Sequence, residues 1–528
     1  MAAARADMMF GVGITTLSNY TRSGRRKLLI LFLVFGSLLF LSTTTERGRS
    51  IATNPPSYVF KPSEKGSCSP KEYSSGRWVR RPYWLRPGPL SKTNADDTLF
   101  DIEPDSGPPV TMTKHEDILK FARFEGCASN REYWLQLGAD IVEMWDRFPR
   151  AHEWEWVPAG QCGLGGGLRE WDKEEMVRDL VEKGGWLLIG DSVTENHFFS
   201  LSCLLYPHVV AVPDYQHGTF DRGWPQNLFL NPTSPLLQDR NNSADATFKP
   251  LRLPPGFDIA QTPLVTYRRV DLLWSRDELS QMHRELHPEV YEQNPTFKLF
   301  SDDLTWTMSP DIYLDIFTKP LPQANYAAMI VSTAGHWTTG LFLGYHNPDG
   351  DASKTLFSNE TEVTASSPPL LTFKAGEGEK LGYDGVLNFF GEVMDRWGKK
   401  VKSTLDSDRG AVLSSGPAGR TVTALRQVII RPYFPGHADC HSHREPWSEI
   451  HPWESADQYW NWADIWKYNR IFEALLAPYE RLHFLKIDKP ARLRPDAHSS
   501  HDCLHLMSGA GVLEGWTHYV WHYLTREL

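Results

Sequence analysis

Two short motifs in the chain carry the residue types that nucleophilic catalysis needs. The first is a Gly-Asp-Ser tripeptide at 190–192, which follows an apolar run at 186–189 and precedes a second apolar pattern at 197–205. The run is short enough for a buried strand, and the later spacing suits a helix. Ser192 would then stand on a strand-to-helix turn, where free N–H groups face charge developing on an attached acyl group. The competing interpretation is an ordinary helix cap, because Asp and Ser are both favoured there.

The second motif lies near the C-terminus, where Asp502 and His505 stand three residues apart. One turn of chain brings two such side chains together, so the histidine can take a proton from a serine while the carboxylate orients it. His336 is the other candidate base for Ser192, although a histidine beside Trp337 is more often a site-lining or core-edge residue. We therefore predict Ser192 as nucleophile, His505 as base and Asp502 as the orienting acid.

Gly-Asp-Ser early and Asp-x-x-His late is the order seen in GDSL/SGNH-type hydrolases and acyltransferases. Between residues 68 and 528, five blocks also resemble, in order, those of the plant trichome-birefringence-like polysaccharide O-acetyltransferases, the PC-esterase family. The blocks are Cys68 with Gly-Arg-Trp-Val at 76–79, Trp-Glu-Trp-Val-Pro at 154–158 with Cys162, Gly-Asp-Ser with Asn196 and 200–205, Thr-Ala-Gly-His-Trp at 333–337, and Asp-Ala-His at 496–498 before Asp-x-x-His. Five ordered blocks are far more specific than one motif.

The resemblance implies both a site and a reaction. Ser192, His505 and Asp502 match the catalytic residues of the family. The residues expected to line the site are Asp191, Asn196, His336 and Trp337. The reaction implied is transfer of an acetyl group to a sugar hydroxyl of a polysaccharide or glycan through an acyl-serine intermediate. No bound cofactor is expected; acetyl-CoA or a relayed acetyl group would be the co-substrate, delivered in the second case by a multi-spanning partner.

Two departures from the family pattern bear on the acceptor. Glu195 stands where the plant members carry Arg, and residues 506–509 replace their Trp-Cys-x-Pro-Gly. A different acceptor, or a divergent branch, is therefore expected. The same triad would also serve a carbohydrate acetyl-esterase with water as acceptor. The third alternative is a non-catalytic glycan-binding protein, because the chain holds 20 tryptophans and aromatic faces pack on sugar rings.

The six cysteines fit an oxidising compartment. Spacing does not choose among their connectivities. The resemblance implies the pairs Cys68–Cys162 and Cys127–Cys503, and it leaves the two others to pair with each other or stay free. Those two are Cys203 and Cys440.

A second chemical cluster lies around Cys440. It comprises His437, Cys440, His441 and His443, all residue types that bind zinc. No second ligand pair follows at the spacing of zinc sites, so we expect no metal there.

The N-terminus carries a targeting signal. Basic residues precede an uncharged stretch at 28–45 that is just long enough to cross a bilayer. We expect a type II signal anchor in the Golgi or another secretory membrane, with a cytoplasmic tail at 1–27, a stem at 46–65 and a luminal catalytic domain at 66–528. A cleaved leader is the alternative. The luminal sequons are at Asn241 and Asn359.

The length of the chain allows two or three average domains or one large α/β domain with insertions, and its composition is that of a globular protein. The chain has 528 residues, of which 41% are hydrophobic, and its net charge of −10 argues against a nucleic-acid partner. Strands are predicted at 186–189, 327–332 and 422–430, and helices at 197–205, 386–397 and 459–476. Alternating strands and helices predict an SGNH-hydrolase-like parallel sheet flanked by helices, with the site at the carboxyl ends of the strands. Polar insertions are expected near 231–262 and 346–380.

Overall fold

The computed structural model describes residues 68–81, 111–163, 167–215, 221–238, 249–346, 382–414, 421–451, 453 and 460–528. All of them belong to one compact unit, Tyr58–Leu528. The predicted tail, anchor and stem, both sequons and most of the insertion at 346–380 lie outside the described residues. A search of the described helices finds none with the length and apolar character of a membrane span.

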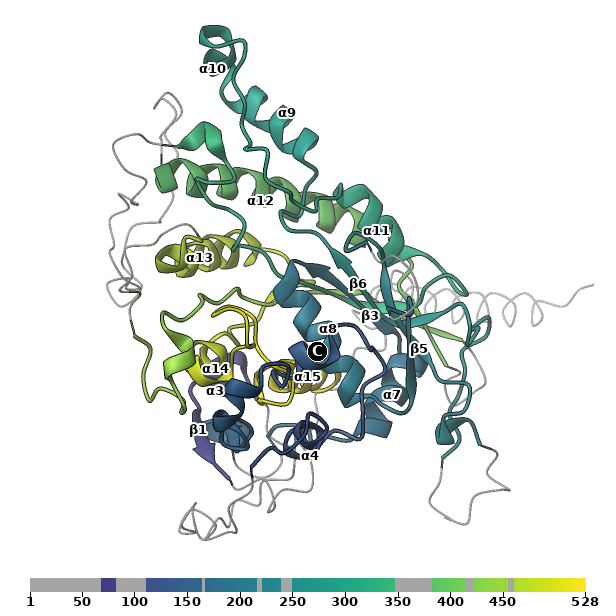
Figure 1. Cartoon of the computed structure of the whole chain (residues 1–528). Helices are drawn as coiled ribbons and strands as arrows, with labels where there is room; N and C mark the ends of the chain where they lie inside the picture. Colours follow the sequence, from purple (N-terminus) through teal and green to yellow (C-terminus); the bar gives the residue numbers. More distant parts are fainter. Residues whose placement is uncertain are drawn as a thin grey trace, which may run out of the picture. The chain divides into compact units, whose positions relative to one another are not determined.

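A mostly parallel sheet that includes β3, β6 and β5 forms the centre of the fold (Figure 1). It has seven strands, in the order β11-β10-β7-β3-β6-β5-β4. The five strands from β11 to β6 run parallel, whereas β5 and β4 each pair antiparallel with their neighbours. The strands are β3 (Gly185–Gly190), β4 (Val209–Val212), β5 (Gln226–Leu230), β6 (Pro263–Arg269), β7 (Tyr326–Val331), β10 (Gln427–Ile430) and β11 (Leu482–Phe484). The α/β class predicted from the sequence is confirmed.

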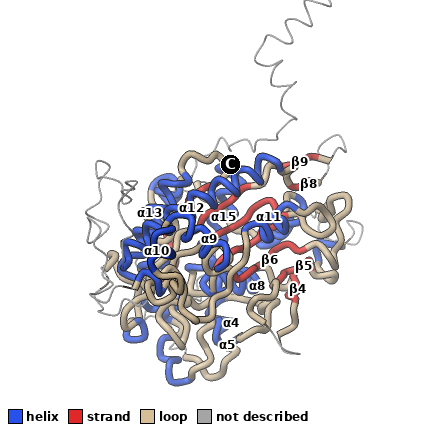
Figure 2. Tube along the Cα trace, turned by 90° about the horizontal axis from the view of Figure 1, so that it is seen from above, coloured by secondary structure: helices blue, strands red, loops and turns tan. Residues whose placement is uncertain are grey.

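Helices cover both faces of this sheet, with α11, α12 and α13 on one side and α7, α8 and α15 on the other (Figures 1 and 2). The longer helices are α7 (Lys173–Glu182), α8 (Ser192–Leu204), α9 (Arg276–Leu286), α11 (Pro310–Thr318), α12 (Gly382–Ser407), α13 (Ile465–Leu476) and α15 (Val512–His522). Shorter ones are α3 (Pro70–Ser74), α4 (Asp117–Ala122), α5 (Tyr133–Gln136), α6 (Gly160–Gly163), α10 (Pro288–Gln293) and α14 (Lys489–Arg492).

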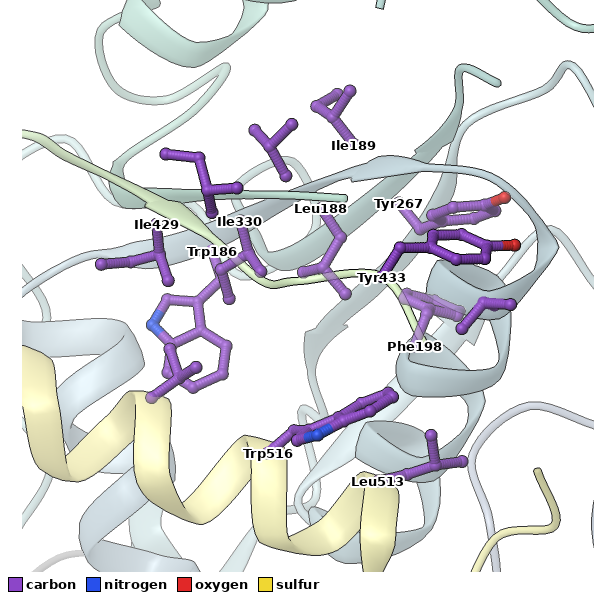
Figure 3. Packing of buried hydrophobic residues seen from close by; sticks show 14 of the residues in the cluster. Trp186, Leu188, Ile189, Phe198, Tyr267, Ile330, Ile429, Tyr433, Leu513 and Trp516 are labelled. Carbon is purple, nitrogen blue, oxygen red and sulfur yellow. The ribbon is translucent and has the colours of Figure 1, made fainter. Parts of the chain in front are cut away.

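The central strand β3 is apolar along its whole length because both of its faces are covered. Trp186 and Leu188 point toward α8 and α15, where Phe198 and Trp516 pack against them, whereas Ile189 points to the opposite face (Figure 3). An unbroken apolar run of this kind is typical of a strand in a buried parallel sheet. The strand predicted at 186–189 is therefore confirmed.

Four other predicted elements differ from the structure by more than one residue, and one of them, the helix predicted at 386–397, is the middle of the longer α12. The strand predicted at 422–430 is in fact two strands, because strand pairing is interrupted at residues 425–426. Arg426 is buried there in an ion pair with Asp408. The first piece, β9 (Val422–Ala424), pairs with β8 (Ala411–Leu413) outside the main sheet, and the second is β10. The helix predicted at 197–205 begins earlier, at Ser192, and the helix predicted at 459–476 begins later, at Ile465.

The N-terminal described residues are held against the C-terminal helix. Strand β1 (Arg77–Arg80) pairs antiparallel with β2 (Trp154–Val157), and Trp78 donates its indole N–H to the carbonyl of Pro490 at 3.0 Å. The Tyr519 hydroxyl of α15 donates to the carbonyl of Cys68 at 2.8 Å. The Cys68–Cys162 disulfide, which the family resemblance implied, ties the two ends of this layer together.

The other implied disulfide, Cys127–Cys503, is wrong. Cys127 bonds to Cys203 at the end of α8, because the Ala128 N–H donates to the carbonyl of Ser202 and brings the two sulfurs together. Cys503 bonds instead to Cys440, whose neighbourhood packs directly on the C-terminal motif. The three bridges in the described residues suit a secreted or luminal protein.

Candidate active site

The nucleophile candidate stands where β3 passes into α8. Asp191 is the helix cap, because its carboxylate accepts the N–H of Val193 at 3.0 Å, and Ser192 is the first helical residue. Ser192 is thus not needed as the cap. A side chain at Gly190 would come within 2.3 Å of the Thr194 hydroxyl, so only glycine allows the helix to turn this closely onto the sheet. Ser192 therefore lies on a tight turn at the carboxyl end of the central strand.

The C-terminal motif meets Ser192 with the geometry of a catalytic triad. The Nε2 of His505 lies 2.7 Å from Ser192 Oγ, and its Nδ1 lies 2.6 Å from Asp502 Oδ2. Because an ionised carboxylate only accepts, the Nδ1–H of His505 donates to it, and Nε2 is left to accept the serine proton. Among the described residues, His505 is the histidine whose ring meets Ser192 Oγ, so the alternative base His336 does not take that place.

The Asp502 carboxylate is held in its ionised form. Burial opposes its charge, but the contact with His505 and the N–H groups of Leu504 and His505 outweigh burial and lower the pKa of Asp502 well below its usual range. Those two N–H groups donate to Asp502 Oδ1 at 2.8 and 2.7 Å. One carboxylate oxygen thus shapes the turn, and the other orients the imidazole.

A pocket of about 330 Å³ opens beside the triad. Apart from the three triad residues, it is lined by polar and aromatic side chains that include Gln136, Asn196, His336, Tyr433, Trp460 and Trp462. Asn196 and His336 therefore lie where the resemblance implied. Trp337 does not, because its ring is fully buried in the core between Phe342 and Phe390. Asp191 is buried beneath the pocket and reaches it through the side chains that contact its carboxylate.

Tyr433 and Asp271 belong to the site environment but were not identified from the sequence. Each follows the carboxyl end of a parallel strand, β10 and β6 respectively, and such ends meet at the same edge of a sheet. That rule was the available signal for both. Gln136, which comes from the segment before the sheet, carries no such signal.

His336 lies between two carboxylates behind the serine. Its Nδ1 is 3.3 Å from Asp191 Oδ2, which also accepts the Tyr433 hydroxyl at 2.7 Å, and its Nε2 is 3.9 Å from Asp271 Oδ2. Burial disfavours the imidazolium, but Asp271 and Asp191 outweigh burial and raise the pKa of His336 above its ordinary value. Burial also disfavours the negative charge of Asp191, yet the contact with His336 keeps the pKa of that carboxyl below its usual range.

The raised pKa of His336 predicts a pH-dependent stability. A pKa that is higher in the folded than in the unfolded state adds stability below the unfolded value, about 6.5, and that stability is lost as pH rises through the folded value. The wild type should therefore be more stable than His336→Gln, and the difference between their free energies of unfolding should be larger at about pH 6 than at about pH 9. Urea titrations of both proteins at the two pH values measure this, and a difference that does not change with pH would contradict it.

The two bridges that involve Cys203 and Cys503 offer a matched comparison. They close loops of similar length, with sequence separations of 76 and 63, so the entropic part of their stabilisation differs by only about 0.2 kcal/mol. Only the Cys440–Cys503 bridge touches the segment that carries the base. Cys440→Ser/Cys503→Ser should lower any hydrolysis of an aryl acetate by at least about tenfold more than Cys127→Ser/Cys203→Ser, with comparable losses of thermal stability. Equal activity losses would show that the bridge at Cys503 plays no special part.

The histidine and cysteine cluster around Cys440 does not present thiolates. Cys440, His441 and Cys503 place their ligand atoms within 4.8 Å of one another, but the two sulfurs are bonded to each other. Cysteine binds zinc as a thiolate, so these two bonded sulfurs are not zinc ligands.

No family model matches the chain, and no curated protein matches it.

Proposed function

We propose that the protein is a serine-dependent acyltransferase that moves an acetyl group onto a sugar hydroxyl of a polysaccharide or glycan. The observation that carries this proposal is the continuous set of contacts from Asp502 through His505 to Ser192 at the edge of a pocket. A serine whose proton has an acceptor at hydrogen-bond distance, itself oriented by a carboxylate, is the arrangement that nucleophilic acyl transfer requires.

The proposed reaction has two steps. In the first, Ser192 Oγ attacks the acyl carbonyl of the donor while its proton passes to His505 Nε2, and the resulting imidazolium returns that proton to the leaving group. In the second, His505 removes the proton from an acceptor hydroxyl, which attacks the acyl-serine and releases Ser192. The backbone N–H of Ser192 stabilises the oxyanion in both steps, because the N–H groups of Val193 and Thr194 already donate to Asp191. Asp502 stays ionised throughout.

Two observations support a sugar as acceptor. The resemblance to the polysaccharide O-acetyltransferases is one. The other is the pocket lining, in which the half-exposed ring of Trp460 and the ring of Trp462 stand beside amide and charged side chains. Aromatic faces pack on the apolar face of a pyranose, and planar polar groups bind its hydroxyls. The acetyl donor is then a co-substrate, and a multi-spanning partner is the proposed source of a relayed acetyl group.

A direct test follows acetyl groups on the full-length protein. An activated aryl acetate serves as donor, alone or with a set of candidate polysaccharides, and intact mass reports acetylation at Ser192 while the polymer is assayed for acetate esters. Acetyl esters on a polymer support the transferase. Release of free acetate with no ester on any polymer would show the esterase. A chain that neither gains an acetyl group nor reacts with a fluorophosphonate would be a binding protein, and the proposal would fail.

The proposed location is the Golgi or another secretory membrane, with the site in the lumen and the chain anchored by residues 28–45. A tag at the N-terminus should be digested by protease added to sealed microsomes, whereas the domain should be protected. Asn241 and Asn359 should shift in mass on glycosidase treatment. A secreted product that begins after residue 42 would instead show that the leader is cleaved.

A further inference from the structure

The segment that contains His437, Cys440 and His441 packs on the hairpin that carries the base. This hairpin, residues 498–506, is closed by an antiparallel bridge between His498 and Leu506, and the Ser499 N–H donates to the carbonyl of His505 at 2.7 Å. Backbone and side-chain contacts join the segment to it along its length. These are the Cys440–Cys503 bridge, the His437 N–H to the carbonyl of Cys503 at 2.9 Å, and the His441 ring to the carbonyl of Ser499 at 2.9 Å.

Two buried histidine rings make a further contact between segment and hairpin. His437 Nδ1 lies 2.6 Å from His498 Nε2, and the two side chains are almost inaccessible to solvent. Their outer nitrogens both face backbone carbonyls. His437 Nε2 lies 3.0 Å from the carbonyl of Arg492, and His498 Nδ1 lies 3.3 Å from the carbonyl of His505. The two rings thus join the end of α14 at Arg492 to the backbone of the base.

A count of protons decides which nitrogens are donors. Two neutral imidazoles carry two N–H groups on four nitrogens. The inner contact uses one of them, so only one of the two outer carbonyls receives a hydrogen bond. The carbonyl of Arg492 is the closer one, and the carbonyl of His505 already accepts from Ser499. His437 and His498 are therefore both protonated on Nε2, with the Nε2–H of His498 donating to His437 Nδ1.

The surroundings keep this pair neutral. Burial lowers the pKa of His437 to about 4, and the nearby His443, Arg492 and His451 act against a positive charge on it as well. Burial and the neighbouring His437 likewise lower the pKa of His498, and the opposing attraction of Asp502 is smaller. The nearby His441 also disfavours a positive charge on His498.

We propose that His437 and His498 are positioning residues for His505, acting as a neutral pair whose His498 Nε2–H to His437 Nδ1 hydrogen bond holds the base hairpin in place. The pair contacts no reacting atom. Its effect passes through the backbone of His505, whose carbonyl lies against the His498 ring. A displacement of the base by about 1 Å would cost about a hundredfold in rate, so a contact that fixes this hairpin governs turnover. The activity readout rests on the proposed function.

Two amide substitutions at one position separate this role from mere filling of space. In His498→Gln the amide nitrogen stands near the former Nε2 and still donates to His437 Nδ1. In His498→Asn it stands near the former Nδ1, and His437 loses its donor. We expect His498→Gln to keep kcat within about threefold of wild type and His498→Asn to lower kcat about 30-fold or more, with KM for the acetyl donor little changed in both. His208→Gln, which replaces a buried histidine whose Nδ1 lies 2.8 Å from Ser234 Oγ beside the edge strand β4, is the control.

Equal activities of the two amide variants, or a better His498→Asn, would overturn the proposal. A second readout needs no activity at all. In Ser192→Ala protein labelled with ¹⁵N-histidine, His437 and His498 should both give the Nε2–H tautomer, and the His505 Nδ1 proton facing Asp502 should persist in His498→Gln but vanish in His498→Asn. A Nδ1–H tautomer at His498 would contradict the pair as assigned. If the wild type transfers no acetyl group, the NMR result alone decides this inference.

Discussion

Replacing Ser192 with alanine is expected to lower acyl turnover by about 10⁴- to 10⁶-fold while changing the free energy of unfolding by no more than about 0.5 kcal/mol. The large effect follows because no other group in the first step can form the acyl bond. The small effect follows because Asp191, and not Ser192, caps α8. The alanine therefore removes an oxygen from the pocket without leaving a helix end unsatisfied.

The control for this substitution lies on the same helix. Ser202→Ala removes a buried hydroxyl that donates to the carbonyl of Phe199 at 2.7 Å, far along α8 from the pocket. Its turnover should match that of the wild type. Turnover is measured with an aryl acetate, and labelling with a fluorophosphonate should fail in Ser192→Ala alone. Residual activity near the wild-type level would remove Ser192 from the mechanism.

Combination of Ser192→Ala with His505→Ala makes the test stricter. Residues that act as one unit give strongly non-additive losses, because the second removal takes away a function already lost. The double variant should therefore be about as slow as Ser192→Ala alone. Multiplied losses would mean that His505 works independently of the serine, and His336, which lines the same pocket, would then be examined as the base.

The parts of this site that could be predicted from the sequence are those encoded by local pattern. The apolar run of β3 followed by Gly-Asp-Ser places a serine at a strand end whichever segments pack around it. The spacing of Asp502 and His505 likewise lets one short turn supply both side chains. Family resemblance supplied the rest of that prediction, namely that these two distant motifs meet.

What could not be predicted depends on tertiary packing. Whether Cys503 bonds to Cys127 or to Cys440 is decided by which loop lies against the hairpin, and spacing carries no such information. Trp337 comes directly after His336 in the segment that follows β7, yet its ring lies in the core, where it stacks on Phe342. The histidine cluster around Cys440 resembled a metal site because ligand residue types were visible, whereas its contacts with the base hairpin were not.

The second large effect is expected at Asp502. Asp502→Asn should lower turnover by about 10⁴-fold, because the amide changes which nitrogen of His505 carries the proton. If the amide oxygen keeps the two backbone N–H contacts of Leu504 and His505, its NH₂ group faces Nδ1. A donor at that place leaves Nδ1 unprotonated and moves the proton to Nε2, which then cannot accept from Ser192.

Asp502→Ala serves as the comparison, because it also removes the acceptor of the two backbone N–H groups that shape the turn. The alanine variant should lose turnover to a similar extent and lose more stability than the asparagine variant, which keeps an acceptor for the two N–H groups but loses the charge. The sign of the pH effect follows from the lowered pKa of Asp502: its stabilising contribution is present above about pH 4 and is lost as pH falls through the folded value. The stability advantage of the wild type over Asp502→Asn should therefore shrink on acidification from about pH 5. Unfolding curves at several pH values measure that change, and kcat with an aryl acetate measures the loss of turnover. If Asp502→Asn kept more than about a tenth of the wild-type kcat, orientation of His505 by this carboxylate would not be part of the mechanism.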